Sequence, residues 1–127
     1  MTFLIWVLII AALLPYLAKA PVAHAMSKLG GYDNKHPRSQ QVKLTGFGAR
    51  ALAAHQNSFE SFMIFAAAIL LAIITEHTGN NIQQLAAIYL VARIIYNIIY
   101  LANIGLLRSV VWFISLACSL TIMVLCL

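Results

Sequence analysis

The sequence predicts an all-α integral membrane protein built as a bundle of four transmembrane helices. Hydrophobic residues make up 63% of the 127 residues, whereas soluble domains contain about 45–50%. Charged residues make up only 9%, against about 25% in soluble domains. The apolar residues fall into four blocks, each long enough to cross about 30 Å of hydrocarbon. Together these observations exclude a soluble globular domain.

The four apolar blocks also predict the domain organisation. The chain has room for a single domain, 1–127, in which we expect helices at about 2–26, 49–75, 82–102 and 108–127. The segment 27–48 is the only long connection, and its glycine, proline and charged residues are typical of a loop.

The first block begins like a secretory signal, because Ala18, Lys19 and Ala20 form a small-x-small pattern. No positive side chain precedes the apolar run, however, and Pro21 would directly follow the cleavage point. We therefore expect a retained membrane helix that is kinked at Pro15.

Basic residues predict how the bundle is oriented. The second loop carries only Glu76 and His77, and Arg108 borders the third loop. Four basic residues occupy the first loop: Lys28, Lys35, Arg38 and Lys43. Because cytoplasmic loops are enriched in lysine and arginine, the first and third loops should be cytoplasmic and both termini should lie on the other side. The net charge of +5 thus reflects topology, and we expect no nucleic-acid partner.

Cysteine and histidine give no sign of a disulfide or a metal site. Cys118 and Cys126 lie eight residues apart in the last block, too far along a helix to pair. Three histidines, His24, His36 and His77, lie singly near loops or helix ends, and their spacing matches no metal site.

Polar residues inside the apolar blocks are the candidate functional groups, because charged side chains are costly in a bilayer. At about 100° per residue, Arg50, Asn57 and Ser61 fall within about 40° of one another on the second helix, with Glu60 about 80° away. His55 points about 140° from Arg50, so we expect it to contact a neighbouring helix or the membrane interface.

The last two helices carry similar polar stripes. A cation and three phenols share one side of the third helix: Tyr89, Arg93, Tyr96, Asn97 and Tyr100. On the fourth helix, Ser109 lies beside a stripe formed by Arg108, Trp112, Ser115 and Ser119. Such stripes on three helices indicate a shared polar site. Alternatively, the arginines are interfacial anchors and Asn57, Glu60 and Arg93 form a network that only stabilises the bundle.

These residues resemble the family of membrane-associated proteins in eicosanoid and glutathione metabolism, known as MAPEG. Arg50, Asn57 and Glu60, within the segment 50–65, resemble the family's second-helix signature. Further matches follow on the third helix and at the start of the fourth: Arg93, Tyr96 and Tyr100, then Arg108, Ser109 and Trp112. The loop segment 33–38 is similar to the bacterial branch, so we expect a location in the bacterial inner membrane.

The resemblance implies a homotrimer that holds glutathione, as co-substrate, between subunits at the cytoplasmic side. The implied glutathione-binding residues are Arg50, Asn57, Glu60, Arg93, Tyr96 and Tyr100, and the implied catalytic residues are Arg108 and Ser109. Glutathione carries two carboxylates and one ammonium, which complement arginines and Glu60. Its thiol needs a nearby cation to ionise at neutral pH, and we assign that role to Arg108.

Two functions from different classes remain open at this point. The first is a glutathione-dependent transferase or peroxidase that acts on lipophilic electrophiles entering from the bilayer. The second is a non-catalytic lipid-binding or interaction protein on the same scaffold, since the family also includes such a member. A small multidrug exporter fits less well, because the segment 2–26 has no membrane-embedded carboxylate.

Overall fold

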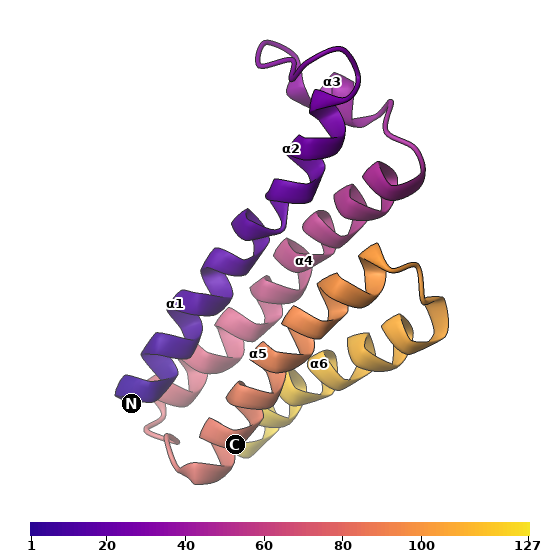
Figure 1. Cartoon of the computed structure of the whole chain (residues 1–127). Coiled ribbons are helices and arrows are strands. Elements are labelled where there is room, and N and C mark those ends of the chain that lie inside the picture. The colour runs from indigo at the N-terminus through magenta and orange to yellow at the C-terminus, as the bar shows by residue number, and fades with distance from the viewer.

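The computed structural model describes all 127 residues and confirms an all-α fold (Figure 1). Four helical segments are long and apolar enough to cross a membrane, and the first of them consists of α1 and α2 together. The helices are α1 (Thr2–Leu17), α2 (Lys19–Ser27), α3 (Pro37–Gln41), α4 (Gly46–Ile74), α5 (Asn80–Leu101) and α6 (Gly105–Leu125).

The expected kink in the first helix is a break between α1 and α2 at Ala18, three residues beyond Pro15. Pro15 and Pro21 both lack the N–H group that a continuous helix would use, so helical hydrogen bonds are lost on both sides of Ala18. The His55 side chain of α4 holds α1 beside the break, because its Nδ1 lies 2.7 Å from the Pro15 carbonyl oxygen. His55 therefore contacts a neighbouring helix, as its position on α4 predicts.

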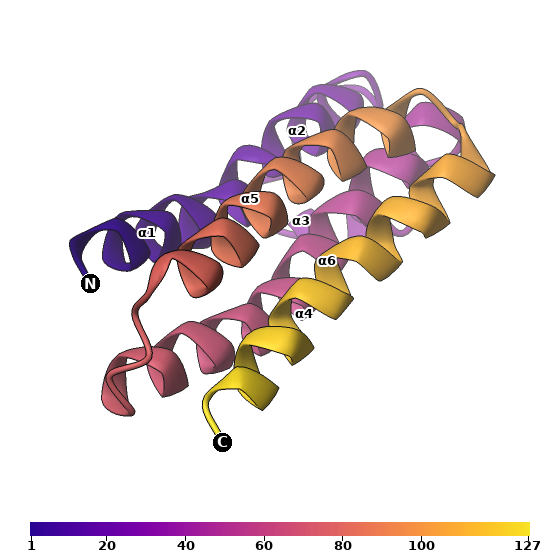
Figure 2. The same ribbon diagram turned by 90° about the horizontal axis from the view of Figure 1, so that it is seen from below.

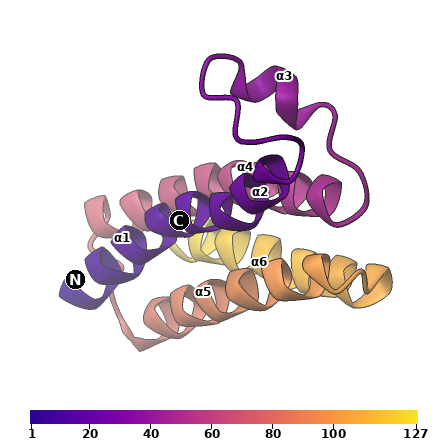
Figure 3. The ribbon, with the colours of Figure 1, turned by 45° about the horizontal axis from the view of Figure 1, so that its top comes forward.

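The connection predicted as a loop contains one short helix, α3. It begins at Pro37, whose fixed φ angle suits a first helical position, and it ends after Gln41. Helix α4 begins at Gly46, three residues before the expected start. Figure 3 shows the connection and α3 standing above the ends of α2 and α4.

Small and aromatic residues form the main core in the half of the bundle that contains the termini. Phe65 of α4 stacks on Tyr89 of α5, with ring centroids 3.7 Å apart and planes 2° from parallel. Alanines let the helices approach closely around this pair: Ala11, Ala68, Ala72 and Ala86, all 2% exposed or less. Most of the polar stripe residues lie in the other half of the bundle, and Tyr89 links the two halves because its hydroxyl lies 3.0 Å from that of Ser61.

Alternating chain direction brings the two predicted cytoplasmic connections to one end. The α2–α4 connection and the α5–α6 turn lie together, while both termini lie at the opposite end (Figures 1 and 2). Helix α6 packs on both α4 and α5. The α5–α6 turn reverses through Asn103, whose positive φ of 63° asparagine tolerates well. This arrangement places Arg108 at the same end as Arg50.

Close packing of α2 against α4 depends on Gly48. A Cβ atom at this position would lie 2.9 Å from Cδ2 of Leu44 and 3.0 Å from Cβ of Ala25, and the alanine cannot move without its helix. We expect Gly48→Val to lower the free energy of unfolding by about 1–3 kcal/mol, the usual cost of overpacking. Thermal unfolding in detergent measures the effect.

The control is Gly105→Ala at the start of α6, where an added Cβ meets no atom within 4 Å. This variant should unfold at or slightly above the wild-type temperature, because alanine restricts the unfolded chain. Equal stability of the Gly48→Val and wild-type proteins would show that α2 and α4 are not packed as closely as described.

Candidate functional site

A hydrogen bond between α5 and α4 lies at the centre of the polar half. Nη2 of Arg93 donates to Oδ1 of Asn57 over 2.7 Å. The Asn97 amide bonds to the Arg93 carbonyl oxygen at 2.9 Å and lies 3.4 Å from the Ser58 hydroxyl. The stripes of α4 and α5 therefore meet, and Arg93 fixes the orientation of the Asn57 side chain.

Arg93 is a buried cation without a carboxylate partner. Its side chain is only 2% exposed, and its guanidinium carbon lies 4.1 Å from the centre of the Tyr96 ring. Its Nε and Nη1 atoms are buried and have no hydrogen-bond partner. The sole ion pair in the structure joins His36 and Asp33, so the stabilising network of the alternative interpretation is present between Asn57 and Arg93 but does not include an ion pair with Glu60.

Five of the eight candidate residues line one open cavity of about 380 Å³ between α4, α5 and α6, here called the Arg108 cavity. Its volume is within the range of about 300–1,000 Å³ that small-molecule sites occupy. The cavity is lined by Asn57, Tyr96, Tyr100, Arg108, Ser109, Trp112 and Phe113.

Arg108 enters this cavity as an unpaired cation. Its guanidinium carbon lies 4.5 Å from the centre of the Tyr100 ring, whose edge in turn packs on Tyr96. The neighbouring Ser109 hydroxyl donates to the Gly105 carbonyl oxygen over 3.2 Å, which leaves its oxygen free to accept. An anion in the cavity would thus meet a positive charge held against a tyrosine face.

A second, smaller cavity of about 140 Å³ adjoins the first and is called here the serine cavity. It shares Asn57 and Trp112 with the Arg108 cavity. Its other lining residues are Glu60, Ser61, Ile64, Ser115, Leu116 and Ser119. Glu60 is exposed in the subunit and unpaired, so the two joined cavities offer one unpaired cation and one unpaired carboxylate.

Two of the candidate residues do not line these cavities. Arg93 donates a hydrogen bond to Asn57 but lines neither cavity. Arg50 shares a face of α4 with Asn57, but its buried Nε has no partner and its side chain lines neither cavity. The sequence also missed a third, polar cavity on the other face of α4, which contains Lys19 and Arg38. Lys19 and Arg38 lie in different segments of the sequence, so no sequence pattern indicated that they line the same cavity.

The joined cavities are suited to bind a polar, zwitterionic molecule and to stabilise an anion at Arg108. They contain no cluster of histidine, cysteine and carboxylate side chains that could hold a metal ion. Cys118 and Cys126 are buried, free and outside both cavities. The residues that line the two cavities thus supply charge and hydrogen bonds, and none of them carries a thiol.

The fold and the site define a multi-pass integral membrane protein with a polar site at one end of a four-helix bundle. The chain belongs to the MAPEG family, whose family model matches residues 3–127, essentially the whole sequence. Members of this family are generally associated with glutathione. Searches of curated proteins and of solved structures each found no match.

Proposed function

We propose that this protein is a glutathione-dependent membrane transferase or peroxidase that acts on lipophilic electrophiles. The observation that carries the proposal is the pair of unpaired charges in the joined cavities: Arg108 in one and Glu60 in the other. Glutathione has the complementary groups, because its thiolate and carboxylates are anionic and its ammonium is cationic. Ser109 and the tyrosines supply hydrogen-bonding groups along the Arg108 cavity.

Arg108 has the chemical role in this proposal. A free thiol is mostly protonated at neutral pH, and a cation beside it favours the thiolate, which is the nucleophile. The guanidinium has only donor groups, so it stabilises the thiolate by its charge and by N–H hydrogen bonds. In the transferase reaction the thiolate then forms a C–S bond to an electrophile that reaches the site from the bilayer, and the leaving group departs with the bonding electron pair. In the peroxidase reaction the thiolate breaks the O–O bond of a hydroperoxide, and a second glutathione completes its reduction to an alcohol and water, with glutathione disulfide as the oxidised product.

A homotrimer in the bacterial inner membrane is part of the same proposal. Glu60 lies about 21 Å along α4 from Ile74, and the hydrocarbon layer of a bilayer is about 30 Å thick. With Ile74 at one boundary of this layer, Glu60 lies inside it. An exposed carboxylate at such a depth is unfavourable in a lone subunit. A neighbouring subunit that covers the cavities, with glutathione held between the two, removes this exposure. Native mass spectrometry in detergent should show the trimer.

One observation also favours the non-catalytic alternative. A wholly apolar groove of about 370 Å³ crosses α5 and α6, and Ile88, Val91 and Ile114 are among its lining residues. This groove suits a lipid chain, whether the lipid is a substrate or a ligand that is only held. Calorimetry with glutathione separates the two functions: binding supports the enzyme, and no binding at millimolar glutathione favours the lipid-binding protein.

The role of Glu60 predicts a selective loss of binding. Glu60→Gln should weaken glutathione binding about tenfold, because one charge-assisted hydrogen bond to the ligand ammonium is lost. The ionisation of the bound thiol should be nearly unchanged, since Arg108 remains. Calorimetry measures the first quantity and the thiolate absorbance of the residual complex measures the second.

Glu76→Gln is the matched control, because it makes the same chemical change in the α4–α5 connection at the far end of the bundle. It should bind glutathione as the wild type does. Equal affinity of the Glu60→Gln and Glu76→Gln proteins would remove Glu60 from the binding site.

A further inference from the structure

The third cavity, of about 330 Å³, lies between α2, α3 and α4 and is here called the Lys19–Arg38 cavity. Its polar lining includes Lys19, Tyr32, Arg38, His55 and Gln56. On α4, His55 and Gln56 point away from the face that carries Asn57, so this cavity is separate from the two described above. No residue lines both this cavity and the Arg108 or serine cavity.

The charge of this cavity is uncompensated. Lys19 and Arg38 are both cations, and no aspartate or glutamate is among the lining residues. Neither cation takes part in an ion pair or a side-chain hydrogen bond, and the Gln56 amide is also without a partner. Two cations that share a cavity repel one another unless an anion lies between them, so the cavity is complementary to an oxyanion.

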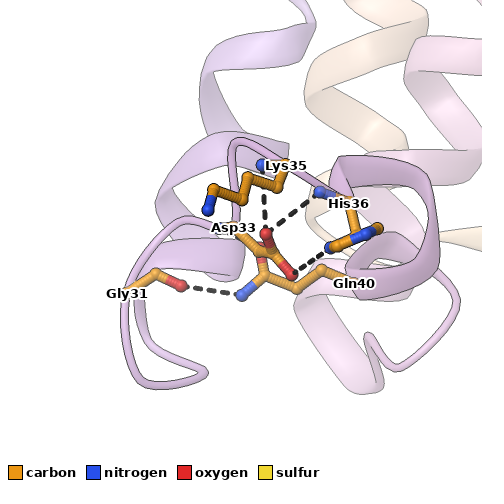
Figure 4. A network of polar contacts seen from close by, with 5 residues as sticks. All are labelled: Gly31, Asp33, Lys35, His36 and Gln40. Carbon is orange, nitrogen blue, oxygen red and sulfur yellow. Dashed lines mark hydrogen bonds and ion pairs between the residues drawn. The ribbon is translucent and has the colours of Figure 1, made fainter.

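A hydrogen-bonded turn holds the loop side of the cavity in place (Figure 4). The buried Gln40 side chain accepts from the Asp33 backbone N–H at 2.9 Å and donates to the Gly31 carbonyl oxygen at 2.7 Å. The Asp33 carboxylate accepts from the backbone N–H groups of Lys35 and His36. Tyr32 and Arg38 belong to this turn and the helix that follows it, so their backbone is fixed before any ligand binds.

The helix side of the cavity is fixed by the break between α1 and α2. A carbonyl oxygen can only accept, so the 2.7 Å contact with Pro15 requires His55 to carry its proton on Nδ1. The His55 ring also packs edge to face on Phe59, and Phe59 packs on Tyr16 of α1. These contacts hold α1 against α4 directly beside Lys19, the first residue of α2.

Helix lengths place the cavity at the edge of the hydrocarbon layer. Lys19 lies about 26 Å along the helix from Thr2, and His55 lies about 29 Å from Ile74. With Thr2 and Ile74 at one boundary of the hydrocarbon layer, the opposite boundary is about 30 Å away, and both Lys19 and His55 lie close to it. That depth is where the phosphate groups of phospholipids meet the acyl chains. Phe59 supplies an apolar surface on the hydrocarbon side.

From this placement, we infer that the Lys19–Arg38 cavity is a binding site for an oxyanion, a phosphate or carboxylate group, at the membrane boundary. Lys19 contributes a point charge from α2, and Arg38 contributes a planar fork from α3 that can bind two oxygens of one anion. The Tyr32 hydroxyl and the Gln56 amide offer further donors. The source of the anion is a lipid headgroup or a soluble molecule, and the inference does not depend on glutathione catalysis.

Binding measurements on the purified full-length protein test this site. The probes are phosphatidylglycerol in mixed micelles, inorganic phosphate, and glutathione. Lys19→Gln and Arg38→Gln should each weaken binding of the preferred probe about fivefold, as expected for the loss of one basic side chain near an anionic group. The control is Lys35→Gln, which removes a cation from the same loop without touching the cavity, and its affinity should equal that of the wild type.

The three probes identify the source. Selective loss of phosphatidylglycerol binding supports a lipid headgroup, and selective loss of phosphate or glutathione binding supports a soluble anion. If Lys19→Gln and Arg38→Gln bind all three probes as tightly as Lys35→Gln does, the cavity holds no anion and the inference is wrong. Because the variants change exposed or cavity-lining atoms, their thermal unfolding should match that of the wild type and exclude misfolding.

Discussion

Arg108→Leu is expected to lower the rate of the chemical step by about one to three orders of magnitude, the usual loss when one positioned charge is removed from a transition state. Leucine fills part of the same volume but leaves the Arg108 cavity without a cation. The glutathione thiol then loses the only charge that lines this cavity and favours its ionisation. Affinity for glutathione should fall much less, because the other lining side chains remain.

Two measurements on the same preparation test this prediction. The thiolate absorbance of bound glutathione should disappear in Arg108→Leu, and turnover of a generic aryl halide should fall in parallel. Arg108→Lys is the companion variant, because it keeps the charge but loses the planar fork, and it should retain part of the thiolate signal. A destabilised Arg108→Leu protein that turned over normally per folded molecule would end the catalytic assignment.

The fold was largely predictable because a bilayer constrains a helix strongly. Four apolar blocks of about twenty residues have few alternatives to four spanning helices. Helical periodicity also predicts directions around an axis, and for this reason His55 could be assigned away from the Asn57 face. The short helix α3 could not be predicted in this way, since it depends on contacts between Gln40 and the distant Gly31 and Met26 carbonyl groups.

The site was predictable in part, for a related reason. Periodicity indicates which residues share a face, and Asn57 and Arg93 do meet across two helices. It does not indicate how far each side chain lies from its neighbours. Arg50 shares the Asn57 face but lines neither of the joined cavities, and Glu60 is exposed rather than paired with Arg93. Lys19 and Arg38 come together only because the first loop folds back over α4.

Arg93→Met is expected to separate stability from ligand binding. In the wild type, a cation that is only 2% exposed has one hydrogen bond, to Asn57, and two buried nitrogen atoms without partners. Removing such an uncompensated charge is favourable, whereas leaving Oδ1 of Asn57 unpaired costs about 1–3 kcal/mol. Methionine has a similar length and adapts its shape to the space. The thermal midpoint of unfolding should therefore be unchanged or higher.

The affinity for glutathione should fall in the Arg93→Met protein, although its thermal stability does not. Without Arg93, the Asn57 side chain loses the donor that orients it in both cavities, and the site loses the positive charge behind it. We expect binding to weaken between about tenfold and a hundredfold, the range for losing a charge-assisted hydrogen bond. Asn57→Asp is the companion variant: it gives Arg93 a carboxylate partner, so the thermal midpoint should rise while the added negative charge repels the glutathione carboxylates.

A purely structural role for Arg93 predicts the reverse pattern. The Arg93→Met protein would then unfold at a lower temperature, and the molecules that remained folded would bind glutathione as tightly as the wild type. Thermal unfolding in detergent and calorimetry on the same samples distinguish the two outcomes. Retained stability with lost affinity would show that the buried cation is kept for the ligand, because a bundle selected only for stability would gain from an apolar side chain at this position.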